Sequence, residues 1–559
     1  MLRRLSIFAG GFTLRAVRAI AADYEISELD VIDCVANLVT KSLVTVDAGG
    51  AMMGYRLLET TRAYSLEKLV EAGEFDAVAR RHARGYLDLI EGAEAEAETR
   101  PTDEWLADYG PRIDNVRVAL DWAFSPGGDA SIGVALTAAA VPLWMHLSLM
   151  EECRDRVEPA LAAIAAVSNR DARREMQLRA ALGASLMYTK GPAPETDAAW
   201  TRTLELAKSV GDATFQLSAL WGLSFYRSIS GEHRTELALA QRFCSVAANR
   251  MDPADSRVGD RMMGTSLHYL GEQVSARYHI ERMLALSTPV VDRVRLYRFQ
   301  FDQVSAARCI FAHILWLQGF PEQAVRVSQS SVDGARASDH ALSLCNALAQ
   351  AACPIAFFVG DLAAVEHFAS MLIEHSERHA LAVWQIWGRC WKGALLIKSG
   401  ETVTGLPLLA HALDELRSAG YVLRYTGFLA VLAEGLGVAG QVAKGLIAIE
   451  EALARTERSE GRWCMAELLR VKGELLRLED APNATSVTDD HFRQALDWAR
   501  RQGALSWELR AAISLARLWR AQARSDEARE LLASVYNRFA EGFATTDLRA
   551  ARDLLNDLA

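Results

Sequence analysis

The sequence predicts an all-α fold: a superhelical array of helical hairpins preceded by a small winged helix. Three observations support this fold class. Apolar residues recur at helical spacing along most of the chain, strand-like runs occur only near its start, and turn residues recur every 40 or so residues beyond residue 190. Hydrophobic residues make up 51% of the 559 residues, which is enough to bury a large core and excludes a mainly disordered chain.

Residues 1–75 are expected to form the winged helix. Thr13 suits a helix N-cap, whereas Ser27 with Asp30 fits a capping box only loosely. Two β-branched runs flank a Gly-rich turn, which predicts a β-hairpin. The expected elements are, in order, a helix after Thr13, a helix after Ser27, strands over 42–46 and 54–58, and a helix over 59–71.

A helical connector is expected over residues 76–129. Its first amphipathic helix, over 80–98, ends before Pro101, because proline cannot continue a helix. Its second helix lies within 105–124, carries apolar residues at helical spacing and ends at a Pro-Gly-Gly turn.

Residues 130–559 are assigned to the array. Two helices of about 15 residues with two short turns need about 40 residues, as in a stretched tetratricopeptide pattern, and a glycine in the turn can take the left-handed conformation that ends the first helix. The interval from Gly271 to Gly319 is longer, which predicts an insertion near Thr288. The expected turn positions are Gly191, Gly231, Gly271, Gly319, Gly360, Gly400, Gly440, Asp480 and Ala523.

The distribution of charge argues against direct DNA binding. The whole chain has a net charge of -10, and acidic and basic residues balance within residues 1–70. The helix that would enter a DNA groove carries Glu28, Asp30 and Asp33, whose carboxylates repel phosphate. We therefore expect an internal, structural role for the winged helix.

No catalytic chemistry or cofactor is expected. The dipeptide Gly-Lys is absent, so there is no Walker-type phosphate loop, and no Gly-x-Ser-x-Gly motif occurs. Residues 435–440 match Gly-x-Gly-x-x-Gly, the pattern of a dinucleotide-binding loop, but no βαβ pattern surrounds them. Gly440 also follows the 40-residue interval of the turn positions, so we interpret these residues as a hairpin turn. The eight cysteines form no Cys-x-x-Cys pair, which favours buried thiols in a reducing compartment.

Three histidines at helical spacing form a stripe that could hold a metal ion. His367, His375 and His379 share one face of a predicted helix. Imidazoles at this spacing can bind a metal, but no acidic base motif accompanies them, and a solvated polar stripe explains the pattern better. We expect no metal.

A tryptophan stripe is the candidate ligand- or partner-facing site. Trp384, Trp387 and Trp391 follow helical spacing, with Arg389 beside them. Such a stripe either lines a binding groove or packs between adjacent hairpins, and core packing is the commoner outcome.

Two apolar segments bear on location. The basic, apolar start is interrupted by Arg15 and Arg18, which argues against a signal peptide. The apolar stretch 132–149 contains Pro142 and His146, which favours a buried helix over a membrane span. We expect a cytoplasmic protein without a membrane partner.

Several stretches resemble bacterial signal-transduction ATPases of the STAND class. Residues 3–12, 38–44 and 55–64 resemble their winged helix, and residues 81–82 and 114–122 resemble the connector that follows it. The C-terminal stretches resemble tetratricopeptide regions of large transcriptional regulators and of some multidomain nucleotidyl cyclases. These stretches are residues 466–475, 508–512, 514–518 and 541–548.

The resemblance implies a regulatory role. STAND-class regulators carry an effector domain and a nucleotide-binding ATPase ahead of the winged helix and repeats, and this sequence starts at the winged helix. In plant-type relatives a nucleotide-sensing histidine follows the second wing strand. Leu57, Leu58 and Glu59 occupy the comparable positions here, so the resemblance gives no clear nucleotide contact in the winged helix.

The first hypothesis is therefore a non-enzymatic regulatory module of a STAND-type transcriptional regulator. Its repeats would sense a protein partner or a small-molecule inducer, and a nucleotide-binding ATPase domain could act with it in trans. The alternatives are the regulatory repeat region of a nucleotidyl cyclase and a free-standing tetratricopeptide adaptor. Leu2, Leu5, Ile7 and Phe8 are expected to form an exposed apolar face, which predicts self-association through residues 1–72.

Overall fold

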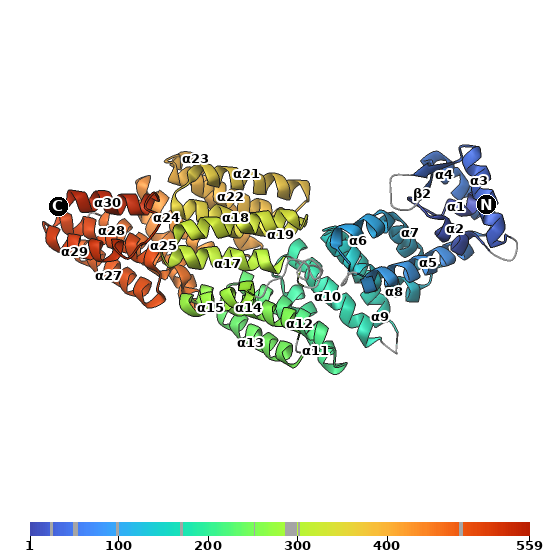
Figure 1. Ribbon diagram of the computed structural model, residues 1–559, viewed down its shortest axis with the longest axis horizontal. Coiled ribbons are helices and arrows are strands. Elements are labelled where there is room, and N and C mark those ends of the chain that lie inside the picture. The colour runs from blue at the N-terminus through green and yellow to red at the C-terminus, as the bar shows by residue number, and fades with distance from the viewer. Residues whose placement is uncertain are drawn as a thin grey trace. The chain divides into compact units, whose positions relative to one another are not determined.

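The predicted fold class is confirmed. The computed structural model describes residues 1–22, 26–47, 54–96, 100–167, 171–250, 252–285, 299, 302–479 and 484–559. Within these ranges one two-stranded sheet lies near the N-terminus, and the other regular structure is helical. Helices that follow one another along the chain pack together in pairs (Figure 1).

The N-terminal domain has the helix and hairpin order of a winged helix. β1 pairs antiparallel with β2, with Val44 opposite Leu57 and Asp47 opposite Gly54, and Phe12 adds a bridge to Tyr55. The elements are α1 (Leu2–Leu5), α2 (Leu14–Ala21), α3 (Glu28–Thr40), β1 (Val44–Asp47), β2 (Gly54–Leu57) and α4 (Glu59–Glu71).

Side-chain caps begin both central helices of this domain. At α3 the capping box is complete, where the sequence suggested only a loose fit. Ser27 Oγ accepts a hydrogen bond from Asp30 N at 3.3 Å, and Asp30 Oδ2 accepts one from Ser27 N at 3.1 Å. At α2, Thr13 Oγ1 accepts from Ala16 N at 3.2 Å. These bonds satisfy backbone donors that a first helical turn leaves unpaired.

The expectation of an exposed apolar start is wrong. Leu5 is 0% exposed, and Ile7 and Phe8 are each 1% exposed. The Phe8 ring stacks on Phe12 at 4.6 Å and meets the edge of His82 at 5.4 Å. These side chains form the core between the winged helix and the connector, so they offer no free face for self-association.

The connector is fixed to the winged helix by the residues that carried the family resemblance. Its helices are α5 (Phe75–Glu96), α6 (Thr102–Tyr109), the short η1 (Gly110–Arg112) and α7 (Ile113–Ala123). Asn115 Oδ1 accepts from Ala9 N at 3.1 Å, and its Nδ2 donates to Gly11 O at 3.3 Å. Arg81 Nε donates to Ile20 O at 2.8 Å. The side chains of these motif residues therefore position the backbone of the winged helix through hydrogen bonds.

The described chain divides into two compact units. Unit 1 contains residues 1–189 and 198–215, and unit 2 contains residues 190–197, 216–292 and 299–559, as far as they are described. The winged helix and connector thus share a unit with the first array helices, α8 (Ala130–His146), α9 (Met150–Ala165) and α10 (Ala172–Thr189). The boundaries expected at residues 75 and 129 stay predictions.

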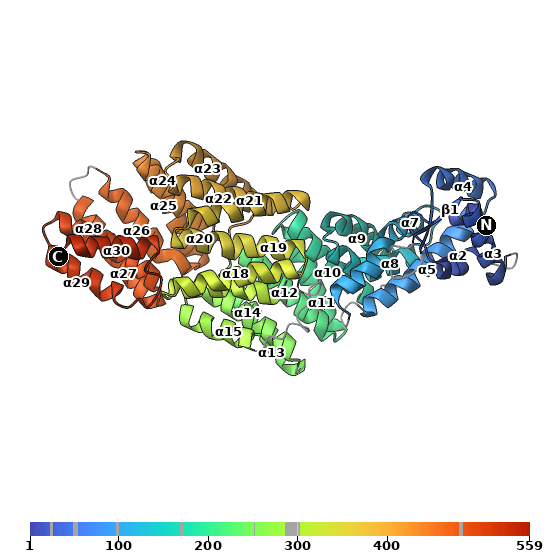
Figure 2. The same ribbon diagram turned by 45° about the horizontal axis from the view of Figure 1, so that its top comes forward.

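The rest of the array is a succession of hairpins, most of them in unit 2 (Figures 1 and 2). We call the first helix of each hairpin an inner helix. The helices are α11 (Pro194–Ser209), α12 (Ala213–Ile229), α13 (His233–Arg250), α14 (Pro253–Leu270), α15 (Gln273–Ala285), α17 (Gln303–Leu317), α18 (Pro321–Ala337), α19 (Ala341–Ala347), the π-helical η3 (Leu348–Ala352), α20 (Cys353–Val359), α21 (Leu362–Arg378), α22 (Ala382–Lys398), α23 (Thr402–Ser418), α24 (Tyr425–Val438), α25 (Val442–Ser459), η4 (Arg462–Cys464), α26 (Met465–Arg477), α27 (Ala484–Gln502), α28 (Leu505–Ala521), α29 (Ser525–Tyr536) and α30 (Thr546–Asp557).

The turn assignments are confirmed wherever the structure describes them. Every described turn position of the predicted series has positive φ, from 60° at Ala523 to 90° at Gly271. Left-handed backbone at these positions ends the inner helix of each hairpin. Asp480 and the insertion expected near Thr288 lie outside the described residues.

Hairpins far apart in the sequence touch within unit 2. The Val422 backbone N–H donates to Ile229 O at 2.9 Å, and Ser506 Oγ donates to Trp316 O. Several inner helices also contact one another directly: α22 with α24, α24 with α26, α26 with α28, and α17 with α28. The interior of the array is therefore lined by side chains from distant repeats.

Among the described residues, one helical segment is long and apolar enough to cross a membrane by length and composition. It runs over Ala341–Val359, and 78% of it is buried inside unit 2. The apolar stretch noted at 132–149 forms α8, which has 17 residues and is mostly buried. Both segments pack as core helices of the array.

Candidate ligand-binding site

An aromatic cavity lies between inner helices of unit 2. Its empty volume, including the part that is open to solvent, is about 630 Å³. Side chains from α20, α22, α24, α26 and α28 surround it, so no single repeat forms it. Its aromatic lining consists of Phe357, Phe358, Trp391, Phe428, Trp463 and Trp507.

The aromatic walls are tightly packed. The Trp391 ring lies 4.7 Å from that of Phe428 and 5.9 Å from that of Phe357, and Trp391 Nε1 donates to Ala349 O at 3.1 Å. Trp507 lies 5.8 Å from Phe358 in an edge-on contact. Such rigid aromatic surfaces bury large apolar area at little conformational cost when a ligand binds.

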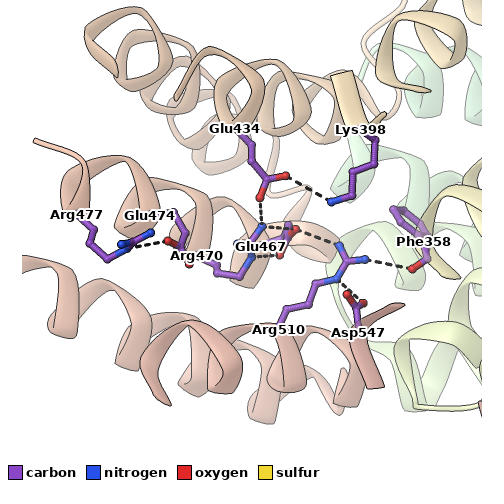
Figure 3. Close-up of polar contacts among 9 residues, drawn as sticks. All are labelled: Phe358, Lys398, Glu434, Glu467, Arg470, Glu474, Arg477, Arg510 and Asp547. Carbon is purple, nitrogen blue, oxygen red and sulfur yellow. Dashed lines mark hydrogen bonds and ion pairs between the residues drawn. The ribbon is translucent and has the colours of Figure 1, made fainter. Parts of the chain in front are cut away.

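A charged wall of the aromatic cavity is formed by Lys398, Glu434, Glu467 and Arg510. Figure 3 shows the polar contacts around these residues. At the centre of this wall, Arg510 Nε donates to Asp547 Oδ2 at 2.7 Å and Nη1 donates to Glu467 Oε1 at 3.2 Å. Its third nitrogen, Nη2, donates to the Phe358 carbonyl at 3.2 Å. The guanidinium therefore joins three helices, α20, α28 and α30, to α26.

Arg470 extends this charged wall along α26 (Figure 3). It donates to Glu467 Oε2 at 2.7 Å and to Glu434 Oε1 at 2.9 Å, and Lys398 Nζ lies 3.9 Å from Glu434 Oε2. Burial by itself raises the pKa of the Glu467 carboxyl, but the charges of Arg470 and Arg510 outweigh it and hold that pKa below its usual range. The charges of this wall are thus matched by one another.

The structure divides the predicted tryptophan stripe. Trp391 lines the aromatic cavity, and Trp387 is 2% exposed and lies 5.8 Å from Phe428 in the core. Trp384 is half-buried, and Arg389 forms an ion pair with Glu415 of α23. The stripe is therefore mainly packing, and only Trp391 reaches a cavity.

The charged residues of the cavity were not predicted from the sequence. Glu434 stands within an otherwise apolar helix, α24, whereas Glu467, Arg470 and Arg510 lie in α26 and α28, which carry further charged residues. Only Glu434 therefore offered a signal, because a buried charge needs a partner. Most partners of these residues lie on other helices, which the spacing within one repeat does not reveal.

The structure places the glycine and histidine motifs noted in the sequence within helices and turns of the array. Gly435 lies within α24. Gly440 has left-handed backbone with φ of 74° and occupies the turn position that the 40-residue interval predicts. His367 and His379 are exposed, whereas the ring of half-buried His375 lies 4.6 Å from that of His379. No group of three potential metal ligands occurs among the described residues.

The cysteines are separate thiols. All eight are unbonded to one another, and only Cys34 and Cys244 are partly exposed. Burial raises the pKa of the Cys464 thiol, which lines the aromatic cavity, to about 12. A thiol in that state is a poor nucleophile.

The chain is similar to a domain family, to curated relatives and to solved structures. A family model described as a winged helix-turn-helix domain matches residues 1–70. A protein of Mycobacterium tuberculosis (strain ATCC 25618 / H37Rv), provisionally named HTH-type transcriptional regulator Rv0890c, is 33% identical over 224 residues, which cover 39% of this chain and 25% of that relative. A second protein of the same strain, Rv0894, is 42% identical over 85 residues, covering 15% of this chain and 22% of the relative.

The chain thus spans about a quarter of the length of the curated relatives it matches. Among solved structures, a Rap protein complexed with competence and sporulation factor has a TM-score of 0.46 at 10% identity, covering 71% of this chain and 99% of that one. The Cut9–Hcn1 heterotetramer has a TM-score of 0.44 at 13% identity and covers 98% of both chains. Residues 1–70 form a winged helix-turn-helix domain, and the chain is similar in part to a transcriptional regulator.

Proposed function

We propose that the chain is a non-enzymatic sensor module of a STAND-type transcriptional regulator. The observation that carries this proposal is the combination of a winged helix-turn-helix domain with a repeat array whose interior holds an aromatic cavity. The similarity to a transcriptional regulator supports the regulatory role. In this proposal the repeats bind a small-molecule inducer or protein partner in the cytoplasm, and a nucleotide-binding ATPase domain receives the signal.

A thermal-shift screen of small molecules tests the sensing role. Val431 lines the aromatic cavity from α24, and Val431→Trp would fill part of it with a bulky side chain. Sensing compounds should raise the melting temperature of the parent chain and not that of Val431→Trp. Val403→Trp is the matched control, because Val403 on α23 is 89% exposed. Equal shifts in all three proteins, or no shift with any compound, would count against a sensor in this cavity.

The regulatory repeat region of a nucleotidyl cyclase is the second candidate. Its support is the resemblance of the C-terminal stretches to the repeat regions of such enzymes. The genomic sequence upstream of Met1 separates the two: an in-frame Walker motif supports the STAND proposal, and an in-frame cyclase domain supports the alternative. If neither is present, the chain acts as a free-standing adaptor.

A further inference from the structure

Unit 2 contains a buried guanidinium that forms no ion pair with a carboxylate of the described residues. Arg424, at the N-cap position of α24, is 4% exposed. Its Nε donates to Gln350 Oε1 at 2.7 Å, and its Nη2 lies 2.6 Å from His313 Nε2. Both partners are uncharged, since burial and the nearby Arg424 hold the pKa of His313 well below its usual range. Among the described residues Arg424 forms no ion pair, unlike Arg470 and Arg510.

Arg424 opens onto a second cavity, which we call the basic cavity. Counted out to solvent it holds about 1070 Å³ of empty space, and its lining includes His233, Arg455, Arg458 and Trp463 beside Arg424. The Arg424 guanidinium lies over the Trp463 ring at 5.5 Å, and both residues line the aromatic cavity as well as the basic cavity.

The charged residues around the basic cavity form ion pairs or are exposed, except for one buried positive charge, that of Arg424. His233 Nδ1 lies 2.9 Å from Glu236, and Arg455 is paired with Glu451 at 2.8 Å. The acidic residue in the lining, Glu232, is itself paired with Arg227 at 2.9 Å. Arg458 is exposed, where solvent screens its charge. The charge of Arg424 is thus buried and, within the described part of the chain, unbalanced.

The backbone at this place adds to the positive potential. Arg424 has left-handed φ of 57° and precedes a 14-residue helix without a side-chain cap. Tyr425 and Thr426 of its first turn line the basic cavity. A helix N-terminus attracts anions, so a buried arginine there is doubly unfavourable until an anion is present.

We propose that the basic cavity binds a small molecule carrying one carboxylate on an aromatic body. The single negative charge of a carboxylate matches the single positive charge of Arg424, whereas a phosphate dianion would bring a surplus of negative charge. Tyr269, Tyr425 and Trp463 supply aromatic walls for the body of the ligand. This inference rests on the proposed ligand-sensing role of the repeats and names the chemistry of one site.

Calorimetry of the full chain with benzoate, benzamide and inorganic phosphate tests the proposal. Benzoate should bind, and benzamide, which has the same shape without the charge, should bind at least about tenfold more weakly because it leaves Arg424 unbalanced. Inorganic phosphate should also bind more weakly than benzoate. Phosphate binding tighter than benzoate, or equal binding of benzoate and benzamide, overturns the proposed ligand class.

Two variants locate the binding. Arg424→Met removes the buried charge, and Gln350→Glu supplies a carboxylate where Nε now finds an amide oxygen 2.7 Å away. Both should weaken benzoate binding about tenfold or more, while Arg417→Met should not, because Arg417 is an exposed residue of α23 paired with Asp414. Unchanged binding in a folded Arg424→Met or Gln350→Glu protein overturns the site.

The two proposals fail in different ways. Compounds that stabilise the parent chain and lose their effect in Val431→Trp keep the sensing role even if benzoate does not bind. Benzoate binding that depends on Arg424 but is indifferent to Val431→Trp supports the basic cavity by itself. Val431 does not line the basic cavity, so the variant probes only the aromatic cavity.

Discussion

Single glycines set both the ends of helices and the closeness of distant hairpins. Gly360 and Gly400 both have left-handed backbone, with φ of 83° and 89°. Around Gly400 an added Cβ would meet no atom within 4 Å, whereas at Gly360 it would lie 2.0 Å from Thr546 Oγ1. The same local turn is therefore a helix stop at one position and a helix stop plus a tertiary contact at the other.

Alanine at these two positions should separate the two effects. Gly400→Ala should lower the free energy of unfolding by about 1 kcal/mol, because the left-handed backbone strains a residue with a Cβ. Gly360→Ala should cost about 1–3 kcal/mol more, because α30 must also move away from the new methyl group. Urea unfolding of both variants measures the difference.

The parent chain and Gly400→Ala together serve as controls for strain alone. Equal losses of unfolding free energy in the two alanine variants would show that Thr546 moves away from the new methyl group at no measurable cost. Melts of both variants that match the parent would contradict the turn assignment itself.

Buried imidazoles make stability depend on pH. His82 is 0% exposed, its Nε2 lies 3.3 Å from Asn115 Oδ1, and burial lowers its pKa to about 4. An unfolded chain binds this proton near pH 6.5, the folded one only near pH 4. As the pH falls between these values, the unfolded state gains protons first, so stability decreases.

His82→Gln should flatten this part of the pH dependence. The lost proton linkage is worth roughly 3 kcal/mol at pH 4 relative to pH 7, whatever the substitution costs at neutral pH. Urea midpoints at several pH values between 7 and 4 measure it. Ser65→Ala is the control, since Ser65 is buried in the same unit and does not titrate, so it should shift all midpoints alike. An unchanged pH slope in His82→Gln would mean that the pKa of His82 does not fall when the chain folds.

At the scale of elements, α3 decides whether the winged helix can approach DNA. It occupies the place of a recognition helix, starts at the Ser27 capping box and contains Glu28, Asp30 and Asp33 but no Lys or Arg. Carboxylates on a groove-facing helix oppose the phosphate contacts that give most of the affinity for DNA.

The full chain should therefore not bind DNA in a gel shift at physiological salt. Asp33→Lys combined with Glu28→Lys should introduce weak, salt-sensitive and sequence-independent binding, because it reverses the sign of the net charge of α3. Asp30 is kept in this variant because it completes the capping box. Tight binding of the parent chain to one DNA sequence would contradict the structural role of the domain.

At the scale of the whole molecule, the chain should neither bind ATP with micromolar affinity nor hydrolyse it. Its sequence contains no Gly-Lys dipeptide and hence no Walker-type loop whose backbone N–H groups could cradle the phosphates. Calorimetry and phosphate release with the purified chain measure both properties. A heat of binding at micromolar ATP would reveal a nucleotide site of a different kind.

The sequence predicted the array because its signals are local. A turn glycine followed by an amphipathic helix specifies one hairpin, and repetition at a 40-residue interval specifies a stack of them. The winged helix was predictable for the same reason, since N-caps and a β-hairpin are short-range features. The burial of Leu5, Ile7 and Phe8 was not predicted, because it depends on α5 of the connector.

By itself, then, the sequence determined the helical hairpins, their turns, the N-terminal domain and the absence of a Walker motif, because the signals for each are short-range features of the chain. Only the tertiary structure decided which charges meet. Arg510 with Phe358, and Arg424 with Gln350 and His313, join residues 74 to 152 positions apart. Spacing along one helix carries no record of such partners, because they are set by how distant inner helices pack against one another.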